Sequence, residues 1–163
     1  MSALNFRHSL KALAFLFSVL LLTSCVTTSP LGPQPSKSPN DDYTYRLLTL
    51  DNALEVLLIS DPDAPKAAAA LDILVGSGDN PRGRAGLAHF LEHMLFLGTE
   101  KYPDAAEYGH FITEHGGSRN VYTSFENTNF FFDVNSDDLP VALDRFAQFF
   151  IAPRFDAQYV ERE

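Results

Sequence analysis

The amino-acid sequence predicts an α+β fold, because patterns typical of strands and patterns typical of helices both occur along the 163-residue chain. Alternating apolar and polar residues, the strand period, occur around Tyr45 and again around Phe132. Apolar residues at the helical period occur around Leu91 and again around Phe146, where they form one stripe suited to packing on a sheet. We therefore expect helices packed against a sheet.

The folded part is expected to begin near Tyr43 with two strands that meet at a turn at Asp51-Asn52. Ala53 stands where a tight hairpin would prefer Gly, so the turn type stays open. The apolar run from Ala67 to Val75 predicts a strand buried on both faces, although its alanines also suit a helix. Residues 76–86 then have the composition of a loop.

Two helices and two strands are expected in the middle of the chain. The helices cover Leu87–Leu97 and Asp104–His115, and Gly116-Gly117 ends the second one. The strands lie within Ser118–Val134. Residues of the second strand that share one face, because they alternate, are Thr128, Phe130, Phe132 and Val134.

A third helix is expected after Ser136 and should end at Pro153. A fourth helical pattern starts near Asp156 and continues to Glu163 without a stop signal. The stripe with which the third helix should pack on the sheet consists of Leu139, Leu143, Phe146 and Phe150.

The charge of the chain disfavours sequence-independent nucleic-acid binding. Its formal net charge is −9, with 12 basic and 21 acidic residues, and the basic residues form no cluster. Neutralising phosphates requires clustered Lys and Arg. We therefore expect no nucleic-acid partner.

The N-terminal segment reads as an export signal. Basic residues precede an apolar run from Ala12 to Leu22 that is too short to span a bilayer comfortably. The run leads to Leu22-Thr23-Ser24-Cys25, which resembles the lipobox of bacterial lipoproteins. This resemblance implies that the chain is cleaved before Cys25 and that a lipid is attached to this cysteine. The alternative is a cleaved secretory peptide with an incidental cysteine. By the same resemblance, an Asp directly after the cysteine would be associated with retention in the inner membrane. Val26 stands there instead, which favours an anchor in the outer membrane, facing the periplasm.

The expected organisation has three parts. Residues 1–24 are the lipoprotein signal peptide, and residues 25–42, rich in Pro, Ser and Thr, are a flexible linker that cannot bury a core. Residues 43–163 are the folded part. Because Cys25 is the only cysteine, no disulfide within the chain is possible.

The chemistry is expected at His89-Phe90-Leu91-Glu92-His93. Two imidazoles four residues apart lie one helical turn apart and reach a single ion from the same side. Glu92 and Phe96 fall in the same sector as His89 and His93, and an apolar back of Leu87, Leu91 and Met94 should face the core. Two imidazoles with a neighbouring carboxylate suit zinc, with Glu92 as general base.

Plainer readings are open for these and other residues. The simplest alternative to a metal site is that His89 and His93 are surface histidines on a helix that happens to carry Glu92. His110 and His115, with Glu107 and Glu114, read as solvated helix surface, although each is chemically able to complete a metal site. The aromatic residues Tyr122, Phe125 and 130–132 read as core or sheet packing.

The segment from Gly86 to Thr99, Gly-Leu-Ala-His-Phe-Leu-Glu-His-Met-Leu-Phe-Leu-Gly-Thr, resembles the signature of the pitrilysin and insulin-degrading-enzyme family of inverzincin zinc metallopeptidases. The resemblance runs from about Tyr43 to the end of the chain. Further positions that match it are Lys101-Tyr102-Pro103, His115-Gly116-Gly117, Asn120, Thr123, Asn129, Phe155 and Tyr159 to Glu163. Val121 departs from the Ala usual at that position.

The resemblance implies a two-layer α/β sandwich in which a mostly antiparallel sheet is backed by helices. It implies that His89 and His93 bind one Zn²⁺, that Glu92 is the base, and that Glu163 is a carboxylate supporting the metal and its ligands. It also implies that Asn120 holds substrate backbone from an edge strand and that Phe96 walls a side-chain pocket. The third zinc ligand of the family, a Glu, would lie about two helical turns beyond Glu163.

The expected function is therefore a zinc-dependent metalloendopeptidase that cleaves peptides or small unfolded proteins. By the same resemblance, residues 43–163 are an incomplete N-terminal domain, which works with downstream domains of the same chain and is inactive alone. Two rivals are open. One is a non-catalytic binding or assembly module, and the other is a lipoprotein domain that uses the strand of Asn120 only to dock a partner.

Overall fold

The computed structural model describes residues 35–162, which divide into two compact units at Asp61 and Pro62. In the first unit, β1 (Thr44–Thr49) and β2 (Glu55–Ser60) form the predicted antiparallel hairpin. Ala53 takes a positive φ of 65°, and the backbone N–H of Leu54 donates to Asn52 Oδ1 at 3.1 Å. The turn thus uses the left-handed conformation without a glycine.

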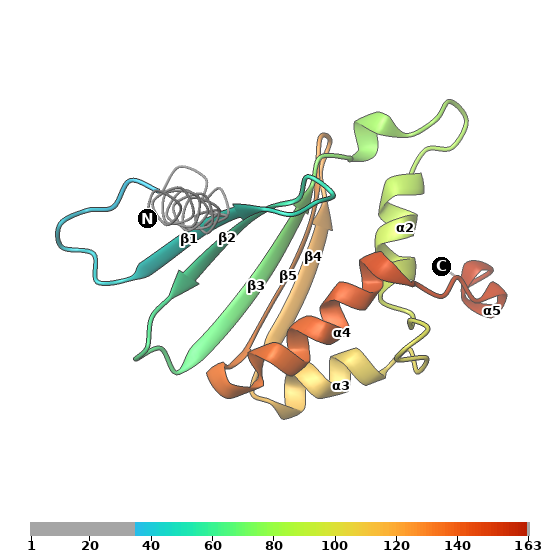
Figure 1. Ribbon diagram of the computed structural model, residues 1–163. Coiled ribbons are helices and arrows are strands. Elements are labelled where there is room, and N and C mark those ends of the chain that lie inside the picture. The colour runs from blue at the N-terminus through green and yellow to red at the C-terminus, as the bar shows by residue number, and fades with distance from the viewer. Residues whose placement is uncertain (1–34, 163) are drawn as a thin grey trace, which may run out of the picture. The chain divides into compact units, whose positions relative to one another are not determined.

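The second unit contains a three-stranded antiparallel sheet. Its strands are β3 (Lys66–Ile73), β4 (Ser118–Thr123) and β5 (Thr128–Asn135), in the order β3-β5-β4 (Figure 1). β4 therefore forms one edge of this sheet. The other elements of the unit are η1 (Ser77–Asp79), α2 (Leu87–Leu95), α3 (Glu107–Glu114), η2 (Ser136–Asp138), α4 (Leu139–Ile151) and α5 (Ala157–Val160).

One face of the sheet is covered by helices, and this confirms the predicted α+β fold with a helix layer on an antiparallel sheet (Figure 1). The predicted inward face of β5 is buried, and Val134 and Phe130 are at most 1% exposed. Apolar residues of the helices complete this core, because burying their surface stabilises the packed layers. The helical residues of the core are Leu95, Tyr108, Ile112, Ala142, Phe146 and Phe149.

One prediction about buried faces is wrong, and another is wrong in part. β3 is a strand, but exposed and half-buried residues alternate along it, so it is covered on one face and not on both. In α4 the fully buried residues are Ala142, Phe146 and Phe149, whereas Leu143 is 43% exposed. Leu139, Phe146 and Phe150 of the predicted stripe do pack on the core, so only Leu143 was misplaced.

Three helix boundaries also differ from the prediction. α2 ends at Leu95, two residues early, and α3 begins at Glu107 because the side chain of Asp104 accepts from the N–H of Ala106 at 2.9 Å and forms a turn first. α5 ends at Val160, and Glu163 lies outside the described residues. Within residues 35–162, no helix is long and apolar enough to cross a membrane.

The loop after β3 packs against the turn between β4 and β5. The N–H groups of Ser77 and Gly78 donate to the carbonyls of Ser124 and Phe125, both at 2.8 Å. Gly76 lies so close to this turn that a Cβ atom would come within 2.6 Å of the Phe125 carbonyl oxygen. A side chain at Gly76 would therefore push the loop off the end of the sheet.

Candidate metal centre

α2 is held at its start by the loop before it. Gly86 has a φ of +86°, a conformation that favours glycine, and its carbonyl accepts from the N–H of Phe90 at 2.8 Å. The side chain of Asn80 accepts from the N–H of Ala88 at 2.9 Å, which satisfies one of the free donors at the helix start. These contacts fix where the first turn begins, and so the direction in which His89 projects.

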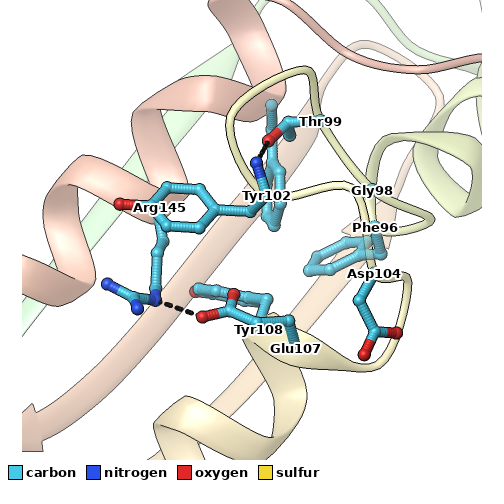
Figure 2. Close-up of a pocket in the computed structure, with 9 residues that line it drawn as sticks. Phe96, Gly98, Thr99, Tyr102, Asp104, Glu107, Tyr108 and Arg145 are labelled. Atoms are coloured by element: carbon cyan, nitrogen blue, oxygen red, sulfur yellow. Dashed lines mark hydrogen bonds and ion pairs between the residues drawn. The ribbon is translucent and has the colours of Figure 1, made fainter.

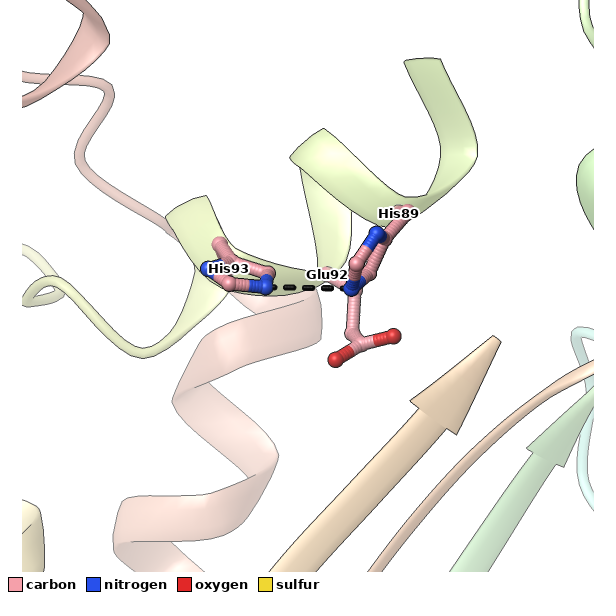
Figure 3. A group of neighbouring side chains, drawn as sticks. All are labelled: His89, Glu92 and His93. Carbon is pink, nitrogen blue, oxygen red and sulfur yellow. Dashed lines mark hydrogen bonds between the residues drawn. The ribbon is translucent and has the colours of Figure 1, made fainter. Parts of the chain in front are cut away.

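The two histidines converge as their spacing predicted. His89 Nε2 and His93 Nε2 lie 3.1 Å apart, and the rings meet edge to face at 80° (Figure 3). Two nitrogens bound to one tetrahedral zinc at about 2.0–2.1 Å lie about 3.3 Å apart. Both residues are exposed. The donor pair therefore fits a single ion approached from solvent.

Glu92 completes a group of three donors on α2. One ligand atom from each of His89, Glu92 and His93 lies within 4.8 Å of the other two. Glu92 itself is only 5% exposed, and its Oε2 accepts a hydrogen bond from Thr123 Oγ1 at the end of β4. In Figure 3 its carboxylate projects below the imidazoles, on the side of the helix that faces the strands. The carboxylate is thus the buried member of the group.

The predicted apolar back of α2 is partly wrong. Met94 is buried as expected, but Leu87 and Leu91 are 44% and 46% exposed. The helix instead packs on β4 with the side that carries Glu92 and Leu95. Glu92 can lie on this inward side because the Thr123 hydroxyl provides a hydrogen bond, which a buried carboxylate requires.

Asn120 lies on β4, the edge strand, as predicted. The side chain is exposed, and its Oδ1 accepts from the N–H of the next residue, Val121, at 2.9 Å. The N–H of Ser124 donates to the carbonyl of Asn127 at 2.8 Å, and bonded pairs recur at every second residue of an antiparallel ladder. The N–H and carbonyl of Val121 therefore point to the open edge.

Phe96 packs into the core next to a small pocket. Its ring lies 5.0 Å from that of Phe149 and 6.0 Å from that of Phe130, between centroids. The pocket beside it has a volume of about 10 Å³, room for about one water molecule. A substrate role for Phe96 stays a prediction. The residues that line the pocket are Phe96, Gly98, Thr99, Tyr102, Asp104, Glu107, Tyr108, Arg145 and Phe149 (Figure 2).

Two ion pairs lie at or near this pocket. Arg145 Nε donates to Glu107 Oε1 at 2.7 Å (Figure 2), and its guanidinium lies over the rings of Tyr102 and Phe111. Asp144 accepts from Lys101 Nζ at 2.7 Å and from the Tyr102 hydroxyl. These two donors hold the pKa of Asp144 below its usual range, and burial raises the pKa of Tyr108.

The other residues considered for the metal site lie elsewhere. The ring of His115 stacks on Phe111 and its Nδ1 lies 2.7 Å from the Phe111 carbonyl, while Glu107 is paired with Arg145. Within residues 35–162, neither joins His89, Glu92 and His93. Glu163 and Cys25 lie outside the described residues. The contact of Thr123 with Glu92 was not assigned by sequence reasoning, although the position of Thr123 matched the family pattern.

Known proteins share sequence and fold with this chain. Residues 55–163 match the family described as Insulinase (Peptidase family M16). The chain is similar to insulin-degrading enzyme of Homo sapiens, with 54% identity over 133 residues, which is 82% of this chain and 13% of that protein. It is similar to A-factor-processing enzyme of Saccharomyces cerevisiae, with 50% identity over 76% of this chain and 12% of that protein.

Among solved structures, the chain is similar to the crystal structure of pitrilysin. The TM-score is 0.75 and the sequence identity is 43%, over 78% of this chain and 14% of that chain. The chain thus spans only 12–14% of the length of these relatives.

Proposed function

This chain belongs to the insulinase family, peptidase family M16, and on that premise we propose that it is the metal-binding part of a zinc-dependent metalloendopeptidase. The observation that carries the proposal is the convergence of His89 Nε2 and His93 Nε2 at 3.1 Å beside a buried Glu92. Nitrogen donors in this arrangement suit zinc better than the oxygen-preferring cations. The substrates proposed are peptides or small unfolded proteins.

His89 and His93 would hold the ion, and the third ligand would come from the downstream sequence of the full-length protein. When bound, zinc supplies a Lewis acid that makes water a nucleophile near neutral pH and polarises the scissile carbonyl. Two imidazoles give fewer protein ligands than the three usual in catalytic zinc sites. We therefore expect residues 1–163 alone to bind zinc weakly and to lack activity.

Glu92 would act as general base and then as general acid. Its carboxylate takes a proton from the attacking water as the oxygen–carbon bond forms at the substrate carbonyl. The same proton then passes to the leaving amine nitrogen as the carbon–nitrogen bond breaks. One ligand atom from each of Glu92, His89 and His93 lies within 4.8 Å of the other two, and the Glu92 carboxylate also accepts a hydrogen bond from Thr123 on the edge strand β4. Such a position suits a proton carrier between water and a peptide nitrogen.

The open edge of β4 would bind the substrate backbone. The N–H and carbonyl of Val121 point to this edge, and an extended peptide adds to such an edge by main-chain hydrogen bonds. Asn120 now accepts from the N–H of Val121, so the amide side chain would turn from that contact to the peptide when substrate arrives. Thr123, on the same strand, contacts Glu92, so a peptide on this edge passes the proposed base.

This function can be tested on the full-length protein by measuring its zinc content and its cleavage of a peptide. We expect it to copurify with zinc and to cleave a quenched fluorescent peptide, and we expect chelator to abolish cleavage and added zinc to restore it. Glu92→Gln should lower kcat by about 10²–10⁴-fold with the zinc content unchanged. Glu114→Gln, an exposed Glu at the end of α3, is the matched control and should cleave normally.

A metal-free protein that takes up no added zinc would contradict the enzyme and favour the non-catalytic binding or assembly module. Full activity in Glu92→Gln with zinc bound would contradict the assignment of the base. Zinc content likewise separates the enzyme from the rival in which the β4 edge only docks a partner, which needs no zinc.

We further propose that the protein is lipid-anchored at Cys25 and faces the periplasm. The support is the lipobox-like Leu22-Thr23-Ser24-Cys25 after a short apolar run. Labelled palmitate should be incorporated into the full-length protein in a bacterial host. Cys25→Ser should lose the label and leave the membrane fraction; a labelled Cys25→Ser protein would contradict the anchor.

A further inference from the structure

Thr123 contacts Glu92 although the two residues lie 31 positions apart in the sequence. It is the last residue of β4 and pairs with Thr128, the first residue of β5. Its side chain lies on the same face of the sheet as the buried Phe130, which is the face that α2 approaches. The end of the substrate-binding strand therefore contacts the proposed base directly.

The direction of this hydrogen bond is fixed by the neighbouring groups. The hydroxyl of Thr123 has a single proton, which it donates to Glu92 Oε2. The adjacent hydroxyl of Thr128 donates to the carbonyl of Val75 at 2.9 Å and lies 3.5 Å from Thr123 Oγ1. A contact of that length competes poorly with the bond to Glu92. Thr128 is thus occupied by the loop after β3.

We propose that Thr123 is a positioning residue for Glu92: its hydroxyl occupies Oε2, so that Oε1 is the oxygen that takes the proton from water. This inference rests on the proposed function and adds to it which carboxylate oxygen reacts and what holds it. In the step, the water O–H bond breaks and an Oε1–H bond forms, while Oε2 stays an acceptor for Thr123. The proton then leaves Oε1 for the amine nitrogen.

The physical effect is orientation. A Glu side chain has several rotatable bonds, and a base that samples many rotamers spends little time within reach of the proton. The Thr123 bond ties one oxygen to the end of a strand that is itself paired with β5. Because the same strand carries the proposed peptide edge, β4 would hold both the substrate and, through Thr123, the carboxylate of Glu92 on α2. Loss of the hydroxyl should therefore lower kcat more than it raises KM.

The kinetic test uses three variants of the full-length zinc-loaded protein. Thr123→Val removes the hydroxyl and keeps the branched shape, and should lower kcat by about 10–100-fold, with KM within about threefold. Thr123→Ser keeps the hydroxyl and should restore kcat to within about threefold of the parent. Thr128→Val is the matched control, since it removes a neighbouring buried hydroxyl that bonds Val75, and it should leave kcat near the parent value.

A second test needs no catalysis. In the metal-free full-length protein, Thr123→Val should lower the urea midpoint when Glu92 is present and have less effect in Glu92→Met, which has no acceptor oxygen. Such non-additivity measures the contact between the two side chains. Zinc affinity should be unchanged by Thr123→Val, because Thr123 contacts the base and not the imidazoles.

Each contrary result would overturn the positioning role. Thr123→Ser as impaired as Thr123→Val would show that the hydroxyl is not what matters. Thr128→Val as impaired as Thr123→Val would show a general effect of the strand end, and additive midpoints would show that the two side chains do not interact. If the parent protein cleaved no peptide, the proposed function would fail, while the metal-free cycle would still decide whether Thr123 holds Glu92.

Discussion

Two polar clusters of the second unit use similar residue types in opposite ways. In the cluster around Arg145, each carboxylate has a cation: Glu107 pairs with Arg145, and Asp144 with Lys101. On α2, two imidazole nitrogens and a carboxylate converge within 4.8 Å. The first cluster pairs opposite charges, whereas the second brings together nitrogen and oxygen atoms that can all act as metal ligands. The comparison separates a cluster of paired charges from one that we propose binds a cation.

The largest expected effect comes from removing one imidazole. His93→Ala in the full-length protein should abolish stoichiometric zinc binding and with it peptide cleavage. Zinc at 100 times its dissociation constant should stabilise the parent by about 2.7 kcal/mol and His93→Ala by much less. Zinc content by elemental analysis and the thermal midpoint with and without zinc would measure both.

His110→Ala is the control for that experiment, because His110 is exposed on α3 and lies outside the α2 cluster. It should keep both zinc and activity. Equal zinc loss in His110→Ala would break the distinction between the α2 cluster and ordinary surface histidines.

The next effect is on stability alone. Arg145→Met keeps the side chain packed on Tyr102 and Phe111 but leaves Glu107 without its cation. The two side chains are 16% and 28% exposed, so we expect a loss of about 2–3 kcal/mol, below the value for a fully buried pair. Urea denaturation of the full-length protein would measure it, and zinc content should not change.

Arg145→Met combined with Glu107→Gln should recover part of that loss, because no unpaired charge then stays partly buried. A fall in zinc content in Arg145→Met, with the protein still folded, would show that the two clusters are coupled and would weaken the comparison.

The α2 cluster was predictable from sequence to the extent that it depends on one helix. The spacing of His89 and His93 sets their convergence, because residues four apart lie on one side of any α-helix. Which side of α2 faces inward depends on where β4 packs, and the residues of the helix alone do not show this. Leu91 was therefore predicted to face the core, whereas the structure leaves it exposed. The bond from Thr123 to Glu92 joins elements that no local pattern connects.

The fold shows the same limit. The alternation in β5 predicted its buried face, because a strand shows each side chain to a fixed side. In β3 the run of alanines gave no alternation to read, and its one-sided burial follows from the helix layer that covers only one face of the sheet. In α4 the helical period placed Leu139, Phe146 and Phe150 correctly, but it included Leu143 at the margin of the stripe, where the structure buries Ala142 instead.

The substrate edge should show a smaller effect. Asn120→Ala removes an amide that we propose turns from Val121 to the peptide, and one hydrogen bond contributes about 0.5–1.5 kcal/mol. We therefore expect KM to rise by roughly 2- to 10-fold with kcat nearly unchanged. Steady-state kinetics on the quenched peptide would measure it, and a fall in kcat alone would contradict the role of Asn120 in substrate binding.

The smallest effect is a pH dependence of the Arg145 cluster. Lys101 and Tyr102 donate to Asp144 and lower its pKa in the folded protein, so the carboxylate contributes stability above its ordinary pKa of about 3.9 and loses that contribution as the pH falls through the lowered value. Asp144→Asn should therefore be less stable than the parent at pH 6, and the difference should shrink as the pH is lowered below about 4. High salt should also reduce this difference in stability, because the Lys101–Asp144 pair is exposed and salt screens it.

Urea midpoints measured at several pH values would test this, with Asp137→Asn, an exposed Asp in η2, as the control. A difference that grows on acidification would mean that Asp144 is held in its neutral form, and the matched-charge description of this cluster would then be wrong.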